Sequence, residues 1–520
     1  MIKTLYIGSS SACFELDSQT QYYSPNQFEV LVDGKTVTKT DTNVFSIFDL
    51  RPDTEYTAEV RFPNTSERVS FKTTTERFCA NVKDFGAIGD GSHEDTVAIQ
   101  TAINLLPDHS RLYFPKGVYL TLPLIMRSHI TLELAEEAVL RAVTDRNRYP
   151  IVPKYIKDAE GNELQLSSFE GNEEDAYVSL IHGSYCEDVT IVGRGALDGN
   201  GQNGDWWRGF NDFPAKRPRT VYMNRCKDIT LHGITVENSP AWHIHPIFSQ
   251  NISILDVFIT APKDSPNTDA IDPESCDNVK IIGCRFSVGD DCIAVKSGKI
   301  DMARKFKTPA TNHVIRNCLM DFGHGALTLG SELAGGIKNV TVTQCWFRGT
   351  DRGLRIKSRR GRGKDSVITD VVFDDIRMEK VKTPIVINMW YNCCDPDRYT
   401  EYVWSRDKLP VDDRTPHLGD FRFSNMVCTE AQAAACYIDG LPESPIDSVT
   451  MENIQISFAE DAQPFVPAMQ NFAEPKCRLG LYLDNVTKVT VKNVTVTGAE
   501  GDGLVTNHCG NITTEGFESK

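Results

Sequence analysis

Imperfect repeats constrain the fold more than any other feature of this chain. Four units begin with asparagine: "NISILDVFIT" from residue 251, "NVKIIGCRFSV" from 278, "NHVIRNCLMDF" from 312 and "NVTVTQCWFRG" from 339. Their starts are separated by steps of 27, 34 and 27, and related units start at Asp188, Asp228, Asp370 and Asp420. A period of this length indicates stacked units, and helical patterns between the strands are missing. The repeats therefore predict an all-β chain whose residues 77–520 form a right-handed parallel β-helix.

The register of these repeats predicts which side chains point inward. At the sixth position after seven of these eight unit starts lies an apolar residue, and these are Ile234, Val257, Cys284, Cys318, Cys345, Ile376 and Met426. We interpret the three cysteines as core residues, because spacings of 34 and 27 do not fit a zinc site. The unit starts Asn251, Asn278, Asn312 and Asn339 recur at one turn, which predicts a structural asparagine ladder.

Residues 1–76 have a different pattern, with short alternating segments such as "FEVLVDG", "EYTAEVRF" and "RVSFKTTTE" between turn residues. This pattern predicts a small β-sandwich. The piece "LRPDTEYTAEV" resembles the Leu-x-Pro-x-Thr-x-Tyr corner of fibronectin type III domains, with Tyr56 as the corner tyrosine. Such a fibronectin type III-like module is expected to bind or space other parts rather than to catalyse.

A strand, a glycine-rich turn and a helix are predicted in "NVKDFGAIGDGSHEDTVAIQTAINLL" from residue 81. Ser92 and Asp95 are the expected capping pair of this helix. Its apolar face is expected to hold Ala98, Ile99, Ala102 and Ile103. The stretch resembles the N-terminal cap of the pectate-lyase-like β-helix superfamily, and no Gly-Lys-Ser/Thr follows that would indicate a phosphate loop.

Charge and composition exclude several classes of partner. A formal net charge of -16 argues against nucleic acid and anionic membrane surfaces as partners. No run approaches the roughly 20 apolar residues of a membrane helix, and "MIKTLYIGSSSACFELD" is not a signal peptide. The 15 cysteines do not suggest a disulfide scaffold. We expect a cytoplasmic protein, or a secreted or periplasmic one if a signal was removed. We expect no cofactor. The sequence does not indicate the oligomeric state.

Polar groups able to do chemistry recur at similar distances from the unit starts. Asp290 and Asp291 stand in "FSVGDDCIAVKSG", at the twelfth and thirteenth positions after Asn278, and His324 stands at the twelfth position after Asn312. Asp269 follows its unit start by 18 positions, and Arg355 follows its own by 16. Because a β-helix stacks equivalent positions of successive coils, we expect these groups on one face, although any single one could have a structural role.

Three carboxylates beside a histidine, an arginine and a lysine suit the hydrolysis of an acidic sugar. One carboxylic acid protonates the leaving oxygen, and another carboxylate activates water or acts as a nucleophile. Crowding raises the pKa of one carboxyl and keeps it protonated as an acid. The alternatives are a plain turn at "GDD" or a calcium site, and the neighbouring cations oppose calcium. No metal is therefore expected.

The run "NTDAID…GDDCIAVKSG…GHGALTLGSE…RGLRIKS" resembles, in order, the four motifs of the polygalacturonases of glycoside hydrolase family 28. The resemblance covers roughly residues 80–510. It implies inverting hydrolysis, with Asp290 as the general acid and with Asp269 and Asp291 holding and activating the water. His324 would tune the acid or contact the substrate. An inverting pair is expected to lie about 6.5–9.5 Å apart.

The resemblance also implies the substrate contacts. Arg355 and Lys357 would bind the sugar carboxylate at the cleavage site, beside Asn267 of the first motif. The segment 352–364, "RGLRIKSRRGRGK", holds seven basic residues and no acidic one. We interpret it as an anion site for further galacturonate units, with contributions from Arg360 and Arg362, rather than an RNA site, because aromatic residues are not interleaved. Tyr391 would stack on a sugar or pack in the core.

The segments "SELAGG", "KSRRGRGK" and 298–312 resemble the exo-acting bacterial branch that carries a fibronectin-like module. Such added segments can close one end of an open groove. The expected function is therefore exo-polygalacturonase activity at the non-reducing end of polygalacturonate or its oligomers. The alternatives are an endo-polygalacturonase, a rhamnogalacturonan or substituted-pectin hydrolase, a pectate lyase, and a non-catalytic sugar-binding β-helix.

Overall fold

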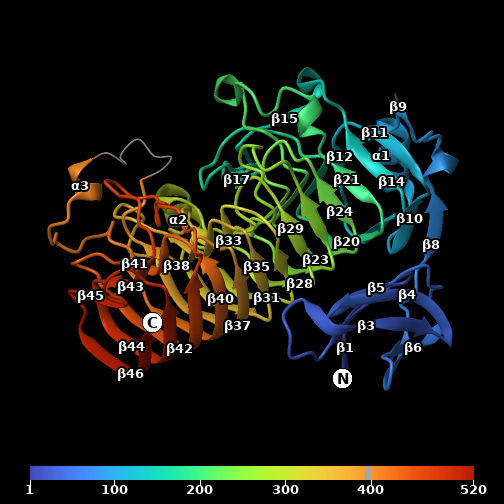
Figure 1. The fold of residues 1–520 in the computed structure, drawn as a ribbon. Coiled ribbons are helices and arrows are strands. Elements are labelled where there is room, and N and C mark those ends of the chain that lie inside the picture. The colour runs from blue at the N-terminus through green and yellow to red at the C-terminus, as the bar shows by residue number, and fades with distance from the viewer. Residues whose placement is uncertain (393–399) are drawn as a thin grey trace.

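A computed structural model of the protein describes residues 1–392 and 400–520. It shows a long parallel β-helix and a small β-sandwich that lies against the flank of its N-terminal half (Figure 1). The predicted β-helix is therefore confirmed. In the part of the chain that is described, no helix has the length and apolar character needed to cross a membrane.

The N-terminal sandwich is built from two antiparallel sheets. One sheet joins β1 (Ile2–Ile7), β2 (Ala12–Leu16) and β5 (Val44–Ile47). The other joins β3 (Tyr23–Val32), β4 (Lys35–Thr42), β6 (Glu55–Arg61) and β7 (Ser66–Lys72). The hydroxyl of Tyr56 accepts a hydrogen bond from the backbone N–H of Arg51 at 2.9 Å. This bond from the tyrosine back to the preceding corner is the contact expected of a corner tyrosine.

The outer wall of the β-helix is one continuous parallel sheet with two tracks of strands. One track holds β8 (Phe78–Asn81), β10 (Ser110–Phe114), β13 (Ile130–Leu134), β20 (Glu187–Gly193), β23 (Lys227–His232), β26 (Gln250–Leu255), β28 (Asp277–Ile282), β31 (Ala310–Arg316) and β34 (Ile337–Thr343). The other holds β9 (Asp90–Glu94), β11 (Gly117–Thr121), β14 (Ala138–Ala142), β21 (Ala196–Asp198), β24 (Thr235–Glu237), β27 (Phe258–Thr260), β29 (Arg285–Ser287), β32 (Leu319–Met320) and β35 (Trp346–Arg348). The tracks merge in the long strands β37 (Val367–Glu379), β40 (Asp420–Ala431), β42 (Ile446–Phe458), β44 (Val486–Thr497) and β46 (Asn511–Ser519), with β39 (His417–Leu418) beside them.

A second face of the β-helix carries the strands that position the site. Its first part joins β12 (Leu124–Ile125), β19 (Ile181–Ser184), β22 (Val221–Asn224) and β25 (Ile244–Ile247). Its second part joins β30 (Ile293–Val295), β33 (Gly325–Gly330), β36 (Arg352–Lys357), β38 (Thr383–Asn388), β41 (Ala434–Asp439), β43 (Leu479–Asp484) and β45 (Leu504–Asn507). Single bridges from Ile244 to Ile271 and from Ile271 to Ile293 connect the two parts. The regular ladder is thus interrupted for one coil.

The predicted inward column lies in the core. Its seven members are at most 2 % exposed and belong to one apolar cluster that runs through the coils: Ile234, Val257, Cys284, Cys318, Cys345, Ile376 and Met426. The three cysteines are free thiols, as are the other ten cysteines in the described ranges, while Cys393 and Cys394 lie outside them. The apolar residues thus align because the strands that flank them pair in register from coil to coil.

The predicted asparagine ladder is also confirmed, with one irregular rung. The side-chain amide of Asn278 donates to Asn251 at 2.8 Å, and that of Asn339 donates to Asn312 at 2.7 Å. Asn312 donates to Asp277 instead of Asn278. All four asparagines have φ values between 56° and 59°. Asparagine suits this turn because it tolerates the left-handed backbone and bonds to its neighbour.

The predicted cap of the first helix is wrong. Helix α1 (Thr96–Leu105) begins directly after Asp95, whose carboxylate accepts hydrogen bonds from the backbone N–H groups of Ile88 and Gly89 rather than from the helix. Ser92 bonds to Asp90. The Asp95 carboxylate therefore bonds to the glycine-rich turn and not to the first turn of the helix, where the capping pattern had placed it. The apolar face is as predicted, with Ile99, Ala102 and Ile103 buried and Ala98 packed against them.

Polar and apolar contacts join the sandwich to the β-helix. The carboxylate of Glu15, which is 2 % exposed, accepts two bonds from the Arg316 guanidinium at 2.6 and 2.7 Å and one from Asn317 at 2.7 Å. In a separate apolar cluster, Val44 of the sandwich packs with Leu255 of the β-helix. A buried ion pair together with an apolar contact fixes the orientation of the two parts.

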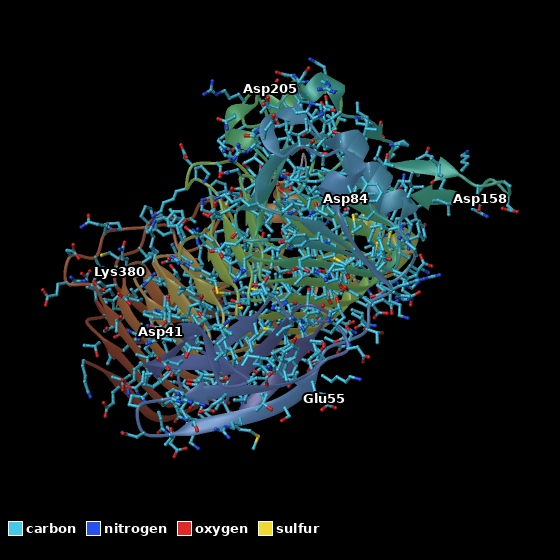
Figure 2. The ribbon with its side chains drawn as sticks, turned by 90° about the vertical axis from the view of Figure 1, so that its right-hand side faces the viewer. Asp41, Glu55, Asp84, Asp158, Asp205 and Lys380 are labelled. Carbon is cyan, nitrogen blue, oxygen red and sulfur yellow. The ribbon has the colours of Figure 1, made fainter. Side chains whose placement is uncertain are left out.

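Insertions project from the face that carries the second set of strands. They hold the pairs β15 (Ile151–Val152) with β18 (Ala176–Tyr177) and β16 (Tyr155–Lys157) with β17 (Glu163–Gln165), and the helices α2 (Ile300–Phe306) and α3 (Glu401–Trp404). The turn between β16 and β17 reaches out from the body of the molecule, with Asp158 at its tip (Figure 2). These insertions form the walls around the site described next.

Candidate active site

The interruption between β25 and β30 lies at the predicted carboxylates. Asp269 stands in the irregular segment that replaces a strand of this face, and Asp290 and Asp291 stand just before β30. One coil further, His324 precedes β33, and Arg355 and Lys357 lie on β36. The parallel register places β36 directly beside β33. Stacking of successive coils therefore brings together residues that are up to 88 positions apart in the sequence.

The three carboxylates are close together, and each offers an oxygen within 4.8 Å of the other two. Asp291 is fully buried and Asp269 is 4 % exposed, whereas the Asp290 side chain is 22 % exposed. The closest oxygens are therefore nearer than the about 6.5–9.5 Å expected between the two carboxyl groups of an inverting pair, a separation that this distance does not measure. The reason is geometric: Asp290 and Asp291 are consecutive, and neighbouring coils are separated by only about 4.7–4.9 Å.

Asp291 is held as an anion. Its two oxygens accept bonds from Arg355 Nη1 at 2.9 Å and from Lys357 Nζ at 2.8 Å. Burial alone would raise the pKa of Asp291, but the positive charges of Lys357 and Arg355 outweigh it and hold this pKa well below its ordinary value. Asp291 therefore stays ionised and is suited to be a base or a water ligand rather than an acid.

Asp269 has the opposite environment. Burial, followed by the negative charges of Asp272 and Asp290, raises the pKa of Asp269 well above its ordinary value. Asp272 is itself completely buried, and its pKa is raised by burial in the same way. The carboxyl whose pKa the crowding raises is thus Asp269, which the sequence alone did not single out. The closeness of these carboxyls means that they titrate as a group rather than one by one.

His324 lies at the open side of the trio. Its Nδ1 is 3.3 Å from Asp290 Oδ1, and its side chain is 46 % exposed. The hydrogen bond with Asp290 raises the pKa of His324 above 6.5, and this outweighs the opposite effect of burial. Below this raised pKa His324 is an imidazolium whose charged Nδ1–H faces Asp290.

We expect His324→Asn to move the alkaline limb of the kcat/KM profile to lower pH. In the folded wild-type protein the pKa of His324 is raised. The contact between its imidazolium and Asp290 therefore stabilises the fold fully below pH 6.5, and this stabilisation is lost as the pH rises through the raised pKa. Without the imidazole, the limb reports a carboxyl alone and should move by about one unit or more. Initial rates on trigalacturonate across the acid, neutral and mildly alkaline range measure this. An unmoved limb would show that His324 does not hold the proton.

A buried lysine below the trio was missed by the sequence analysis. Lys296 Nζ lies 3.0 Å from Glu332 Oε2 and 3.7 Å from Asp272 Oδ1, and it sits 4.6 Å from the centre of the Trp242 ring. Lys296, Glu332 and Trp242 all line the same cavity as Asp269 and Asp290. The signal was present, because Lys296 lies in the "GDDCIAVK" stretch that predicted the site, directly after the buried Val295.

Asn267 is held in place by an arginine that the sequence analysis did not name. Arg217 Nη2 donates to Asn267 Oδ1 at 2.6 Å, and Arg217 Nη1 donates to the carbonyl oxygens of Pro240 and Pro266. Asn267 has a φ of 55° and lines the cavity. Arg217 thus orients Asn267 and fixes the segment that leads into Asp269.

The proposed anion patch of segment 352–364 is corrected by the structure. Six of its seven basic residues are at most 8 % exposed, and these are Arg352, Arg355, Lys357, Arg359, Arg360 and Arg362. Arg355 and Lys357 line the cavity together with Tyr391. Arg360 does not, because its guanidinium is fully buried and paired with Glu443 at 2.6 and 2.9 Å. Arg362 is 3 % exposed and also lies outside the lining.

The cavity around the trio is small, at about 240 Å³. On one side it is lined by Glu170, which belongs to the insertion between β14 and β19. The next residue, Gly171, accepts a hydrogen bond at its carbonyl oxygen from the backbone N–H of Lys299, at 2.9 Å. Lys305 of α2 binds Glu163 and Glu173 of the same insertion. The wall therefore consists of two insertions clasped by hydrogen bonds and ion pairs.

A second wall stands on the side of the later coils. It contains Met469 and Tyr391, which line the cavity, and Tyr391 forms a backbone bridge with Gln470. Arg352 donates to the carbonyl oxygens of Val466 and Pro467 and so anchors the insertion between β42 and β43. Tyr391 is 5 % exposed, so most of its side chain is buried within this wall.

Comparison with known proteins identifies the family. The family described as "Glycosyl hydrolases family 28" matches residues 162–477, and "Rhamnogalacturonase A/epimerase, pectate lyase-like" matches residues 79–133. A "Probable polygalacturonase" of Vitis vinifera is 32% identical over 394 residues, covering 74% of this chain and 75% of that protein. An "Endo-polygalacturonase" of Pectobacterium parmentieri is 29% identical and covers 57% of this chain and 72% of its own length.

Solved structures agree with this assignment. The family 28 exopolygalacturonase of Yersinia enterocolitica has a TM-score of 0.74 at 19% identity, covering 99% of this chain and 98% of its own, and it shows a common fold over the whole length. The hyperthermoactive exopolygalacturonase of Thermotoga maritima has a TM-score of 0.65 at 26% identity, covering 81% of this chain and 92% of its own. With its motifs gathered around one cavity, the chain belongs to glycosyl hydrolases family 28, the polygalacturonase family, and is a glycoside hydrolase.

Proposed function

We propose that the protein is an inverting exo-polygalacturonase that releases galacturonate units from the non-reducing end of polygalacturonate or its oligomers. The observation that carries the exo mode is the cavity itself. Its volume of about 240 Å³ is below the usual range of about 300–1,000 Å³ for ligand pockets, and insertions stand on two sides of it. A long polymer needs a groove that is open at both ends, whereas a chain end needs only a pocket.

The roles of the carboxylates follow from their environments. Asp290 is the general acid, because it is the most exposed member of the trio and has the ionisable His324 at 3.3 Å. Asp291 is held ionised by two cations, which suits it to orient and activate water together with Asp269. Two hydrogen bonds of about 2.7–2.8 Å let one water bridge oxygens up to about 5.5 Å apart. Oxygens within 4.8 Å of one another therefore leave room for a bent bridge.

Arg355 and Lys357 lie beside the reacting groups, and they favour a sugar that carries a carboxylate. Both already bind Asp291, so each would divide its donors between Asp291 and the substrate. A planar guanidinium has five N–H donors, which permits this sharing. Asn267 and Tyr391 complete the proposed substrate contacts. A neutral sugar at the cleavage site would leave these buried cations without a second partner.

Whether hydrolysis inverts or retains the anomeric configuration can be measured directly. Inverting hydrolysis of the α-linkage releases the β-anomer first, and proton NMR during the first minutes of the reaction distinguishes it from the α-anomer. Early α-anomer would indicate a covalent intermediate and would refute the single-displacement part of this proposal.

We expect early product from polygalacturonate and trigalacturonate to be monomer or dimer alone, with a chelator present and without ultraviolet absorbance. Chromatography of the products over time measures this, and the viscosity of the polymer should fall slowly relative to the release of reducing ends. A ladder of intermediate oligomers would leave the hydrolase but overturn the exo mode. Ultraviolet-absorbing products would indicate a lyase, and no cleavage would indicate another sugar or a binding protein.

A further inference from the structure

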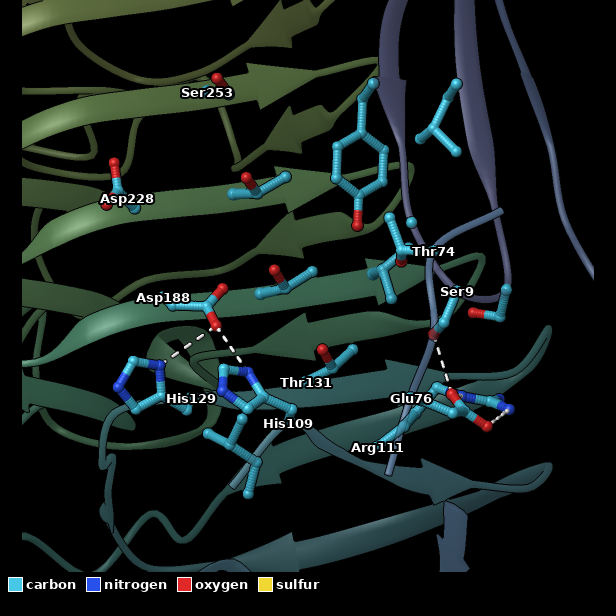
Figure 3. A pocket seen from close by; sticks show the side chains of 18 of the residues that line it. Ser9, Thr74, Glu76, His109, Arg111, His129, Thr131, Asp188, Asp228 and Ser253 are labelled. Carbon is cyan, nitrogen blue, oxygen red and sulfur yellow. Dashed lines mark hydrogen bonds and ion pairs between the residues drawn. The ribbon is translucent and has the colours of Figure 1, made fainter. Parts of the chain in front are cut away.

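A cluster of two histidines and an aspartate lies outside the catalytic cavity, on the flank where the sandwich meets the β-helix. His109 Nδ1 is 3.3 Å and His129 Nδ1 is 3.2 Å from the same oxygen of Asp188, Oδ2 (Figure 3). In the described part of the chain, only this cluster and the catalytic trio gather three such ligand atoms within 4.8 Å of one another. Arg111, which lines the neighbouring cavity, is paired with two glutamates rather than with Asp188.

The cluster continues the column of the asparagine ladder. Strand register aligns Arg111 with Thr131, Thr131 with Thr190, and Thr190 with Thr230, so the residues two positions earlier also stack. The column therefore reads His109, His129, Asp188, Asp228, Asn251 and Asn278. The first three have φ values of 59°, 57° and 56°, like the asparagines. The backbone turn is the same, but the side chains at this end are imidazoles and a carboxylate.

A ladder does not by itself explain how these side chains are arranged. In the asparagine part, Asn278 bonds to Asn251 in the adjacent coil. Asp188 instead contacts two imidazoles. His109, which is two coils away, contacts the same Asp188 oxygen as His129, which is in the adjacent coil. The two rings lie 4.8 Å apart and are tilted by 47° rather than stacked. Three side chains thus converge on one point instead of pairing along the column.

The distances suit a tetrahedral cation. Bonds of about 2.0–2.1 Å from zinc to nitrogen and oxygen give ligand-to-ligand distances of about 3.3–3.4 Å, close to the 3.2 and 3.3 Å observed here. Two imidazoles and one carboxylate form a donor set that zinc and similar divalent transition metals prefer over calcium. The cluster borders a cavity of about 470 Å³ lined by hydroxyl side chains such as Ser9 and Thr131, so a fourth position is open to water (Figure 3).

We propose that His109, His129 and Asp188 form a binding site for a divalent transition-metal ion of the zinc type. The ion joins three successive coils at the rim of the cavity between the sandwich and the β-helix. It lies outside the catalytic cavity, so the site is independent of the hydrolytic reaction. The sequence alone did not predict this ion.

The test uses the full chain, stripped of metal with a chelator and desalted, and titrated with zinc chloride by calorimetry. Wild type should bind one zinc ion per chain, and His109→Asn and His129→Asn should each weaken binding by at least about tenfold, since loss of even an outer partner of a metal site costs about 10–100-fold. Asparagine is the residue that the same column carries at Asn251, so these variants keep the turn. Circular dichroism and Tm check that they fold.

His508→Asn is the matched control, because it removes one imidazole from a histidine–aspartate pair, with Asp484, that lacks a second histidine. It should leave zinc binding unchanged. Cobalt(II) should give the intense visible bands of a tetrahedral site in wild type and not in the double variant of His109 and His129. Equal zinc binding by wild type and this double variant would overturn the proposal, as would the absence of zinc binding by wild type.

Discussion

Asp290→Asn should lower kcat on trigalacturonate by about 10²–10⁴-fold, which is the usual contribution of a general acid. The change is close to isosteric and the side chain is partly exposed, so the fold should stay intact. The amide oxygen can still accept the backbone N–H of Asp291, as Asp290 Oδ1 does at 3.0 Å. What is lost is the carboxylic acid that, in the proposed mechanism, protonates the leaving oxygen.

The leaving group separates the roles of Asp290 and Asp269. A 4-nitrophenyl galacturonide has a leaving group that departs without protonation, so Asp290→Asn should retain much of its activity on this substrate. Asp269→Asn and Asp291→Asn should lose activity on both substrates, because water is no longer activated. If Asp269→Asn were the variant rescued by the good leaving group, the raised pKa of Asp269 would mark it as the acid, and the assignment of Asp290 would be wrong.

Asp264→Asn is the control for these substitutions. Asp264 is an exposed carboxylate on the segment that leads to Asp269, and it does not line the cavity. Its replacement changes the net charge by the same amount and should leave kcat on both substrates unchanged. A loss of activity in this control would mean that the long-range field, rather than the chemistry of the trio, explains the effect.

Arg360→Met should destabilise the protein by about 3–5 kcal/mol without raising KM. The side chains of Arg360 and Glu443 are 0% and 1% exposed, and Arg360 also donates to the carbonyl oxygens of Tyr402 and Ser405. Removing the guanidinium leaves a buried carboxylate and these carbonyl oxygens without a partner. The urea midpoint of unfolding, and kcat/KM measured well below that midpoint, check the two parts of the prediction.

Arg414→Met is the matched control, because Arg414 and Asp412 form an exposed pair with 52% and 38% of their side chains accessible. Loss of such a pair should cost at most about 1 kcal/mol. Replacing Glu443 by Leu together with Arg360→Met should restore part of the lost stability, since both buried charges are then gone. A raised KM with unchanged stability in Arg360→Met would instead support a substrate contact.

Patterns that repeat along the chain were readable without coordinates. The spacing of the asparagine-led units predicted the β-helix, the inward cysteines and the stacking of Asp269, Asp290, Asp291 and His324 in one region. This worked because parallel coils repeat the same backbone conformation, so a constant offset from the turn gives a constant position on the face. The ladder of asparagines followed from the same rule.

Contacts between insertions were not readable in this way. The sequence places Arg355 and Arg360 close together in one basic run, yet one lines the cavity and the other is buried against Glu443, 83 positions later. The same holds for Asp95, which bonds to the preceding turn rather than capping its helix. The local sequence pattern predicts charge and secondary-structure propensity. The burial of a side chain depends instead on which segment from elsewhere in the chain packs against it.

By itself, the sequence determined the architecture, the interior column and the three carboxylates that the structure brings together. The tertiary structure alone decided which basic residues face the cavity, that Lys296 and Glu332 line it as an ion pair, and that insertions wall it on two sides. It also decided that His109, His129 and Asp188 meet, although they belong to three separate coils. The physical reason is that coils of unequal length stack in register, so partners come from the neighbouring coil and not from the neighbouring sequence.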